Sequence, residues 1–377
     1  MVKKRKIKFK KPMRILLKVI GIIFGIILII FTIYKILENN LNKIGYSDKA
    51  AYNIITKFKI SYVNDYPNNK TLNAAFETDK YYKEKNLEHY SKITYQKQDD
   101  LIKNINSLLK VGYSDREISM ILKHGDSKSV ADFAKKEKIK YLEEFFSYDF
   151  AKLENYDRYI AFMNEVGDDE ETTIIKVNLD LDKEPYTDAV KVNDYSKLVL
   201  ANKHHYLGKN YIPKNLINVP SKYLVSDEKV KGTNEAVSAA IKMIKQAEKE
   251  GLNLLISSGY RSYKDQEEVY NTYKDLYGES YCLKYVSFPG YSEHQTGYSF
   301  DFASGSSNIF KDSKEYKWMV RNSYKYGFIY RYLKSKEEIT EITSEQWHFR
   351  YVGVDAAKII DDEELSLEEY YVKYLDK

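Results

Sequence analysis

The stretch SEHQTGYSFD, from Ser292 to Asp301, decides how the C-terminal half of this 377-residue chain folds and what chemistry it can carry. Gly290 and Gly297 predict a sharp loop that leads into a strand, and Asp301 belongs to that strand. Such a turn lets a histidine of the loop and an aspartate of the strand face one ion. A second segment, EQWH from Glu345 to His348, offers another histidine and a further carboxylate.

Together the two segments provide the side chains of a catalytic zinc site. Catalytic zinc commonly takes three protein ligands from His and Asp or Glu and leaves the fourth position to water. His294 and Asp301 supply two ligands, and His348 is the best candidate for the third. Glu345 is a carboxylate that need not bind the ion and can accept the proton of the water. Each residue alone would more often be structural, but the four in this context predict a metallohydrolase with Zn²⁺ as its cofactor.

The surrounding sequence predicts interleaved helices and strands. Val237, Ile241 and Ile244 recur at helical spacing between Thr233, a suitable N-cap, and Gly251, which ends the helix. Regular βαβ spacing is absent from the sequence, which favours an α+β domain with a central antiparallel sheet and flanking helices. The expected elements are a helix at 234–250, strands at 252–257, 299–303 and 347–352, and a turn at 258–262 that leads into a helix bearing Gln266.

A resemblance to a known family rests on three segments: SGYRS (Ser258–Ser262), PGYSEHQTGYSFD (Pro289–Asp301) and EQWHFRYVG (Glu345–Gly353). They resemble the zinc D-alanyl-D-alanine carboxypeptidases, which include accessory carboxypeptidases of vancomycin resistance and peptidoglycan L,D-carboxypeptidases. The family pattern is S-x-H-x-x-G-x-x-x-D followed by E-x-W-H. The match covers 186–358, about half of the chain.

The resemblance implies roles for individual residues. It implies that His294, Asp301 and His348 bind zinc and that Glu345 is the catalytic base. Arg261 matches the substrate arginine of the family, which would meet the terminal carboxylate of a peptide or the oxyanion of the tetrahedral intermediate. The alternative for Arg261 is a surface salt bridge.

Other positions concern the substrate. Gln266 and Ser292 match frequent family positions, where such residues bind substrate or support a neighbouring turn. The chain departs from close relatives, which often have Pro where Leu333 and Gln346 stand and Gly where Glu341 stands. None of the three is a ligand, and Glu341 bears on the rim of the cleft and hence on substrate choice.

The resemblance implies a zinc carboxypeptidase that trims the C-terminal D-alanine of peptidoglycan stem peptides. L,D-carboxypeptidase action on tetrapeptide stems uses the same zinc chemistry, so the motif residues do not separate the two reactions. A catalytically inactive wall-binding or scaffold protein is the alternative of another class. The presence of all four catalytic residue types disfavours it.

The N-terminus predicts a single-pass membrane anchor. The first 18 residues carry nine Lys or Arg and no acid, and Val19–Tyr34 is an uncharged run of 16 residues. Lys18, beside this run, can snorkel to the lipid headgroups. No small-x-small cleavage site follows, which favours a retained anchor over a cleaved signal peptide. The positive-inside rule predicts a cytoplasmic tail at 1–14, a lipid-embedded anchor at 15–37 in the cell membrane, and an extracytoplasmic remainder.

Residues 38–171 are expected to form a mainly helical extracytoplasmic region. LNKIGYSD at 41–48 recurs as LLKVGYSD at 108–115. Each copy combines a glycine that ends one helix with a serine that caps the next. Ser114 and Glu117 have the spacing of a capping box.

A domain boundary is expected near residue 171. The acidic run at 167–171 lacks the spaced ligands of a calcium loop and indicates a solvated linker. TTIIKVNL at 172–179 is rich in β-branched residues and predicts a strand. The zinc carboxypeptidase domain is therefore expected to cover 172–377.

Composition excludes several classes of protein and site. Cys282 is the only cysteine, so an intramolecular disulfide and a cysteine-based metal site are both excluded. The net charge of +5 comes from the N-terminal tail, so the folded part offers no basic excess for nucleic acid. The remaining histidines, His89, His124, His204 and His205, match no metal position, and structural roles are expected for them.

Overall fold

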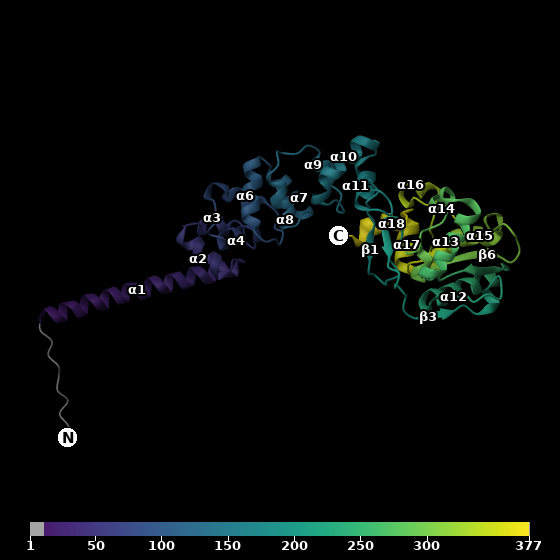
Figure 1. Ribbon diagram of the computed structural model, residues 1–377. Coiled ribbons are helices and arrows are strands. Elements are labelled where there is room, and N and C mark those ends of the chain that lie inside the picture. The colour runs from purple at the N-terminus through teal and green to yellow at the C-terminus, as the bar shows by residue number, and fades with distance from the viewer. Residues whose placement is uncertain (1–10, 377) are drawn as a thin grey trace, which may run out of the picture. The chain divides into compact units, whose positions relative to one another are not determined.

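The computed structural model describes residues 11–376, and the chain divides into two units (Figure 1). The N-terminal unit runs to Ser147 and includes Ala151–Glu154. The C-terminal unit contains Tyr148–Phe150 and the chain from Asn155 onwards. The first ten residues of the predicted basic tail lie outside the described residues.

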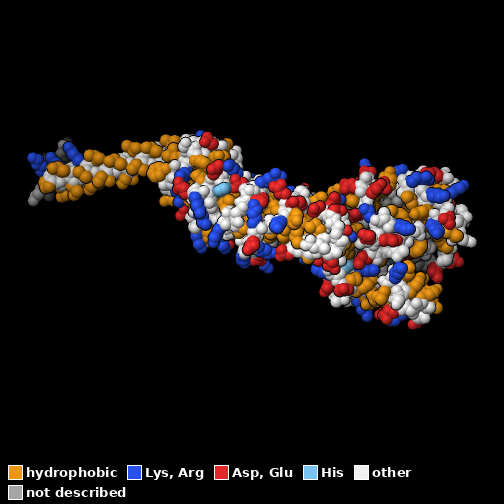
Figure 2. Space-filling model, turned by 90° about the horizontal axis from the view of Figure 1, so that it is seen from above, with side chains coloured by type: hydrophobic (Ala, Val, Ile, Leu, Met, Phe, Trp, Pro, Cys, Tyr) orange, Lys and Arg blue, Asp and Glu red, His pale blue; other side chains and the backbone are white. Residues whose placement is uncertain are grey.

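The N-terminal unit begins with a long apolar helix, α1 (Lys11–Lys43). Its apolar side chains are exposed from Met13 to Ile36, and they cover the length of the helix in Figure 2. Among residues 11–376 it is the one helix long and apolar enough to cross a membrane, a property that signal sequences share. Its 33 residues extend ~50 Å, more than the ~30 Å hydrocarbon core of a bilayer. At its C-terminal end Leu41 is buried.

Short capped helices make up the rest of this unit. The predicted echo is confirmed in its geometry: Gly45 and Gly112 have φ of +95° and +104°, and Ser47 and Ser114 cap the helices that follow. The capping box of Ser114 with Glu117 is also confirmed. The helices are α2 (Asp48–Thr56), α3 (Ile60–Asn64), α4 (Lys70–Glu77), α5 (Leu87–Lys92), α6 (Leu101–Val111), α7 (Asp115–His124), α8 (Ser127–Phe133) and α9 (Leu142–Phe146).

The strand predicted at 172–179 is wrong, because these residues lie in a helix. α10 (Tyr156–Val166) is followed by α11 (Glu170–Asn178), and both belong to the C-terminal unit. Asp169, expected in a solvated linker, is the N-cap of α11 and accepts a hydrogen bond of 2.8 Å from the backbone N–H of Thr172. The cap and the burial of Ile174, Ile175 and Val177 override the strand preference of the β-branched side chains.

A four-stranded antiparallel sheet lies at the centre of the C-terminal unit, in the order β5-β6-β8-β7. The unit therefore mixes helices and a sheet, as the sequence predicts. The strands are β5 (Leu254–Ser258), β6 (Ser299–Ser304), β7 (Phe328–Tyr330) and β8 (His348–Tyr351). Two-stranded ribbons pair β1 (Val190–Val192) with β2 (His205–Leu207) and β3 (Leu216–Asn218) with β4 (Lys231–Thr233).

The two faces of this sheet serve different purposes. Phe300, Phe302 and Phe349 are buried in a core that the helix α12 (Asn234–Lys249) completes. Because side chains alternate along a strand, Asp301 and His348 point from the opposite face. One face of the sheet therefore holds the core, and the other holds the predicted metal ligands.

Helices surround this sheet, with α12 on one side of β6 and α14 on the other (Figure 1). Thr233 caps α12, as predicted, by accepting a hydrogen bond from the N–H of Ala236. Ser262 ends the turn after β5 and caps the next helix. The remaining helices are α13 (Tyr263–Tyr277), α14 (Glu279–Tyr285), α15 (Lys314–Asn322), α16 (Glu337–Thr340), α17 (Val354–Asp362) and α18 (Leu367–Tyr370).

Candidate active site

Strand pairing brings the three predicted metal ligands together. Asp301 on β6 lies opposite His348 on β8, and its Oδ1 is 3.1 Å from His348 Nδ1. His294 comes from the short helix η4 (Glu293–Thr296), and its Nε2 lies 3.5 Å from the same oxygen. One donor atom from each residue lies within 4.8 Å of the other two. Within residues 11–376 this is the one group of its kind.

The loop before β6 fixes the position of His294. Gly297 has a φ of +73°, and a Cβ there would come within 3.1–3.2 Å of three neighbouring side chains. Glycine is therefore required where η4 turns into the strand. His294 Nδ1 lies 2.7 Å from the carbonyl oxygen of Gly259, immediately after β5. A carbonyl oxygen only accepts, so Nδ1 donates and Nε2 keeps its lone pair for an ion.

Glu293 fixes the ring of His348 from the side away from Asp301. Glu293 Oε2 lies 3.2 Å from His348 Nε2, whereas Nδ1 faces Asp301. The carboxylate accepts a hydrogen bond from Nε2–H, so Nδ1 is the nitrogen that can bind a metal. Sequence reasoning did not assign a role to Glu293, although it lies between Ser292 and His294.

Two buried arginines balance the charge of Glu293. Its Oε1 accepts a hydrogen bond of 2.7 Å from Arg331 Nε and lies 3.0 Å from Arg350 Nη1. Arg331 also donates to Glu368 of α18, at 2.8 Å between Nη1 and Oε2. The four residues are at most 2% exposed. Burial alone would raise the pKa of Glu293, but the two arginines hold it well below its ordinary value.

The same environment sets the charges of the ligand triad. Burial lowers the pKa of His294, and the nearby Arg261 lowers it further, so its imidazole is neutral. Burial alone would raise the pKa of Asp301, but His294 and His348 hold it well below the usual range. Burial opposes the charged form of His348, yet its bonds to Asp301 and Glu293 raise its pKa to about 9. A metal ion at this point would displace that proton.

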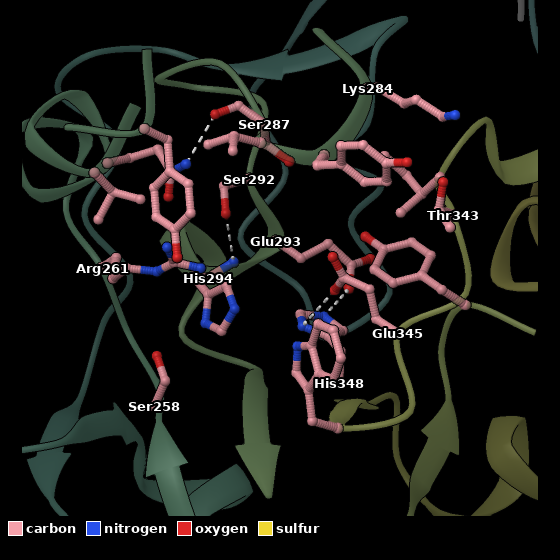
Figure 3. Close-up of a pocket in the computed structure, with 18 of the residues that line it drawn as sticks. Ser258, Arg261, Lys284, Ser287, Ser292, Glu293, His294, Thr343, Glu345 and His348 are labelled. Atoms are coloured by element: carbon pink, nitrogen blue, oxygen red, sulfur yellow. Dashed lines mark hydrogen bonds and ion pairs between the residues drawn. The ribbon is translucent and has the colours of Figure 1, made fainter. Parts of the chain in front are cut away.

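Glu345 lies beside the triad without joining it. Its Oε2 is 3.9 Å from His348 Nδ1, and Figure 3 shows its carboxylate directed toward the same pocket. Burial raises the pKa of Glu345 to about 7, with Asp301 adding to the effect and His348 opposing it. A carboxylate with such a pKa can both accept and return a proton near neutral pH.

A pocket of about 600 Å³ is lined by His294, His348 and Glu345, together with Arg261, Gln266 and Ser292 (Figure 3). The Arg261 guanidinium is largely buried, its Nε has no hydrogen-bond partner, and burial lowers its pKa. Gln266 donates through Nε2 to the carbonyl of Ser287, while its Oε1 has no partner. Ser292 Oγ accepts a hydrogen bond of 3.4 Å from the N–H of His294 and so supports the loop. The pocket therefore presents unsatisfied polar groups at one end.

The donor set fits zinc. One anionic carboxylate and two imidazoles, each held by a hydrogen bond through its other ring nitrogen, form the usual three-ligand catalytic arrangement. The two second partners are the carbonyl of Gly259 and the carboxylate of Glu293.

Glu341 stands at a position where close relatives often have glycine. It has a φ of +53°, a left-handed conformation in which glycine is unstrained and other residues are not. Its Oε2 lies 2.9 Å from Nε2 of the buried His204. Glu341 thus adds a hydrogen-bond partner for His204 at a position where the backbone favours Gly.

Comparison with known proteins identifies the family. A family model described as D-alanyl-D-alanine carboxypeptidase, VanY, matches residues 229–354. The putative carboxypeptidase YodJ of Bacillus subtilis is 42% identical over 189 residues, which cover 48% of this chain and 69% of that protein. The bifunctional D-Ala-D-Ala dipeptidase and carboxypeptidase VanXYC of Enterococcus gallinarum is 33% identical over 181 residues, which cover 46% of this chain and 93% of that protein.

One solved structure is similar to about half of the chain. A mutant of the vancomycin-resistance D,D-pentapeptidase VanY, in complex with Zn(II), is 29% identical, with a TM-score of 0.41. The match covers 47% of this chain and 99% of that one. From its sequence relatives, this chain belongs to the VanY family of D-alanyl-D-alanine carboxypeptidases, which are zinc metallopeptidases.

Proposed function

We propose that this carboxypeptidase removes the terminal D-alanine of peptidoglycan stem peptides, with zinc held by His294, Asp301 and His348. The observation that supports the proposal is the unpaired Nε of Arg261 in the pocket. The Arg261 guanidinium lines the same pocket as Glu345, His294 and His348, and its buried Nε lacks a partner. A planar cation left unsatisfied in this way fits the terminal carboxylate of a peptide, which it can bind through two parallel hydrogen bonds.

Gln266, Ser292 and Glu345 have separate roles in this proposal. Gln266 offers its free Oε1 to an N–H of the bound peptide, and Ser292 keeps the His294 loop in place. Bound zinc supplies the Lewis acidity that polarises a carbonyl and lowers the pKa of water. Glu345 accepts the proton of the attacking water and passes it to the leaving amine, for which its pKa of about 7 is suited.

Mass spectrometry of muropeptides tests this function. Purified full-length chain is incubated with pentapeptide and tetrapeptide muropeptides, with chelator or with added Zn²⁺. We expect the pentapeptide to lose one D-alanine, the chelator to stop the reaction and Zn²⁺ to restore it. Loss of D-alanine from the tetrapeptide instead would assign L,D specificity. Bound zinc without cleavage of either substrate would favour the inactive wall-binding protein.

Arg261→Gln tests the carboxylate contact. A buried charged hydrogen-bond pair lost on one side costs about 2–5 kcal/mol, so we expect KM to rise by at least about thirtyfold. A peptide that ends in a carboxamide should be equally poor for the wild type and for Arg261→Gln. Arg321→Gln is the control, since Arg321 is exposed on α15. Equal loss of both peptides' turnover with KM unchanged would contradict a carboxylate role.

We also propose that α1 anchors the enzyme in the cell membrane, with 1–14 in the cytoplasm and the catalytic domain outside. Support comes from its exposed apolar surface and from the basic residues that precede it. The test is alkaline extraction of membranes, combined with protease access to tags at both chain ends. We expect an alkali-resistant protein with a protected N-terminal tag and a digested C-terminal one. Loss of the N-terminal tag from mature protein would indicate a cleaved signal peptide.

A further inference from the structure

Four tyrosines form a row of neighbouring rings where α13 passes into α14. Tyr273, Tyr277, Tyr281 and Tyr285 recur at every fourth residue on either side of Gly278. Ring centroids of successive members lie 5.9, 4.8 and 4.8 Å apart, and those of Tyr273 and Tyr281 lie 6.2 Å apart. We call these four residues the tyrosine row.

The tyrosine row faces solvent. Tyr273, Tyr277 and Tyr285 are 40%, 60% and 45% exposed. Leu276 and Leu283, on the same two helices, are 67% and 47% exposed. Exposed apolar side chains scattered singly are ordinary, but a contiguous patch of aromatic rings is typical of a binding surface.

The row is continuous with the catalytic pocket. Tyr273, Tyr281 and Tyr285 line the same pocket as Arg261 and Glu345, whereas Tyr277 lies outside it. Lys284 also lines this pocket, and Figure 3 shows it well separated from Arg261. Its Nζ lies 5.2 Å from the Tyr285 ring centroid. A molecule bound at Arg261 and extending out of the pocket therefore has an aromatic wall beside it.

We propose that the tyrosine row binds a sugar ring of the glycan that carries the stem peptide. The inference rests on the proposed function, because only a peptidoglycan substrate joins a sugar to the peptide being cut. A five-residue stem spans at most ~17 Å, so its sugar stays near the pocket rim when its carboxylate reaches Arg261.

The chemistry of the row suits a pyranose. Tyrosine combines a flat apolar face, against which the C–H face of a sugar can stack, with a phenolic hydroxyl for its polar edge. Because the rings already pack against one another, less side-chain entropy remains to be lost on binding. Lys284 adds a donor for hydroxyl or acetamido oxygens.

The test compares two substrates with the same pentapeptide, one free and one attached to the N-acetylglucosamine–N-acetylmuramic acid disaccharide. With the full-length zinc enzyme we expect kcat/KM to be about tenfold higher for the attached peptide, through a lower KM. Tyr277→Ala should bring this ratio close to one, whereas Tyr277→Phe should preserve it because the stacking face remains. Tyr195→Ala is the control, an exposed tyrosine outside the row (45% exposed, against 60% for Tyr277).

Binding of the peptide-free disaccharide, measured by calorimetry, separates this inference from the proposed function. If neither substrate is cut but the disaccharide binds wild type and not Tyr277→Ala, the row is a sugar site and the proposed function is wrong. Equal rates for the two substrates in the wild type, without disaccharide binding, would overturn the sugar site. A change in sedimentation on Tyr277→Ala with unchanged rates would also overturn it, because the row would then join two copies of the chain.

Discussion

Replacement of Glu293 by glutamine tests whether a residue outside the ligand triad determines the zinc affinity of the site. Glu293→Gln keeps the shape of the side chain and removes its charge. In the present fold its carboxylate meets Arg331 at 2.7 Å, Arg350 at 3.0 Å and His348 at 3.2 Å. Arg331 retains Glu368, but Arg350 loses its carboxylate neighbour.

The expected cost to stability follows from burial. Removal of one partner from a buried ion pair costs about 3–5 kcal/mol, and the amide oxygen of Gln recovers part of this by accepting one hydrogen bond. We therefore expect a net loss of about 2–4 kcal/mol. For a unit of this size that lowers Tm by roughly 5–15 °C.

The expected cost to zinc binding is separate. Residues that hold the second nitrogen of a metal-bound histidine typically contribute 10–100-fold to metal affinity. A neutral amide in place of Glu293 should weaken the bond that orients His348, so the zinc dissociation constant should rise by about this factor. Competition with a chromophoric chelator measures it, alongside thermal unfolding of the zinc-free protein.

Glu315→Gln provides the matched control. Glu315 is 3% exposed and accepts hydrogen bonds from the N–H of Asn253 and the hydroxyl of Ser304, both at 2.9 Å. It contacts none of the triad, so its replacement should lower Tm without changing zinc affinity. Unchanged zinc affinity in Glu293→Gln would refute the reasoning. An equal loss in both variants would assign the effect to general destabilisation instead.

Three further predictions concern catalysis, proton linkage and backbone strain. Glu345→Gln should lower kcat by about 10²–10⁴ at unchanged zinc affinity, and full activity in single-turnover assays would exclude it as the base. Because the pKa of His348 is about 9 without metal, zinc binding at pH 7 should release a proton, measurable by calorimetry in buffers of different ionisation enthalpy. The folded pKa of His348 lies above its ordinary value of 6.5, so protonation of His348 stabilises the metal-free fold. This stabilisation is complete below about pH 6.5 and disappears as the pH rises through 9. Glu341→Gly should be more stable than Glu341→Ala by about 1 kcal/mol in thermal unfolding, since both lose the His204 contact but only Gly relieves the left-handed strain.

Sequence reasoning located the candidate site because its side chains are chemically distinctive. His294, Asp301, His348 and Glu345 stand in ordered motifs, two of them histidines in a chain with six, and the structure brings all four together. The pairing of Asp301 with His348 depends on the register of β6 and β8, which a sequence does not show. What the motifs predict is the donor set, whereas the sheet determines which ring nitrogen faces the ion.

The buried charges around Glu293 were missed for a related reason. Glu293, Arg331 and Glu368 are far apart along the chain, and each alone has the character of a surface residue. One signal was available in the sequence. Arg350 alternates with His348 on a predicted strand and should therefore share the face of the metal ligands, where a cation needs a buried carboxylate.

The mistaken strand at 172–179 has a cause within the chain's own repetition. In the N-terminal unit Tyr90 donates to Asn106 of α6, and in the C-terminal unit Tyr159 donates in the same way to Asn178 of α11, each at 2.7 Å. The neighbouring asparagines repeat the contact as well: Asn86 bonds to Asn106, and Asn155 bonds to Asn178.

The internal repetition therefore extends beyond the two GYSD segments at 41–48 and 108–115, to 86–106 and 155–178. If α11 is a copy of α6, its place in the repeat favours a helix, although its β-branched side chains favour a strand. Local propensity predicted a strand because it weighs each window alone, whereas the repeated Asn–Tyr contacts fix the helix through partners some twenty residues away. An alignment of 86–106 with 155–178 on these asparagines and tyrosines would have predicted α11 as a helix from the sequence itself.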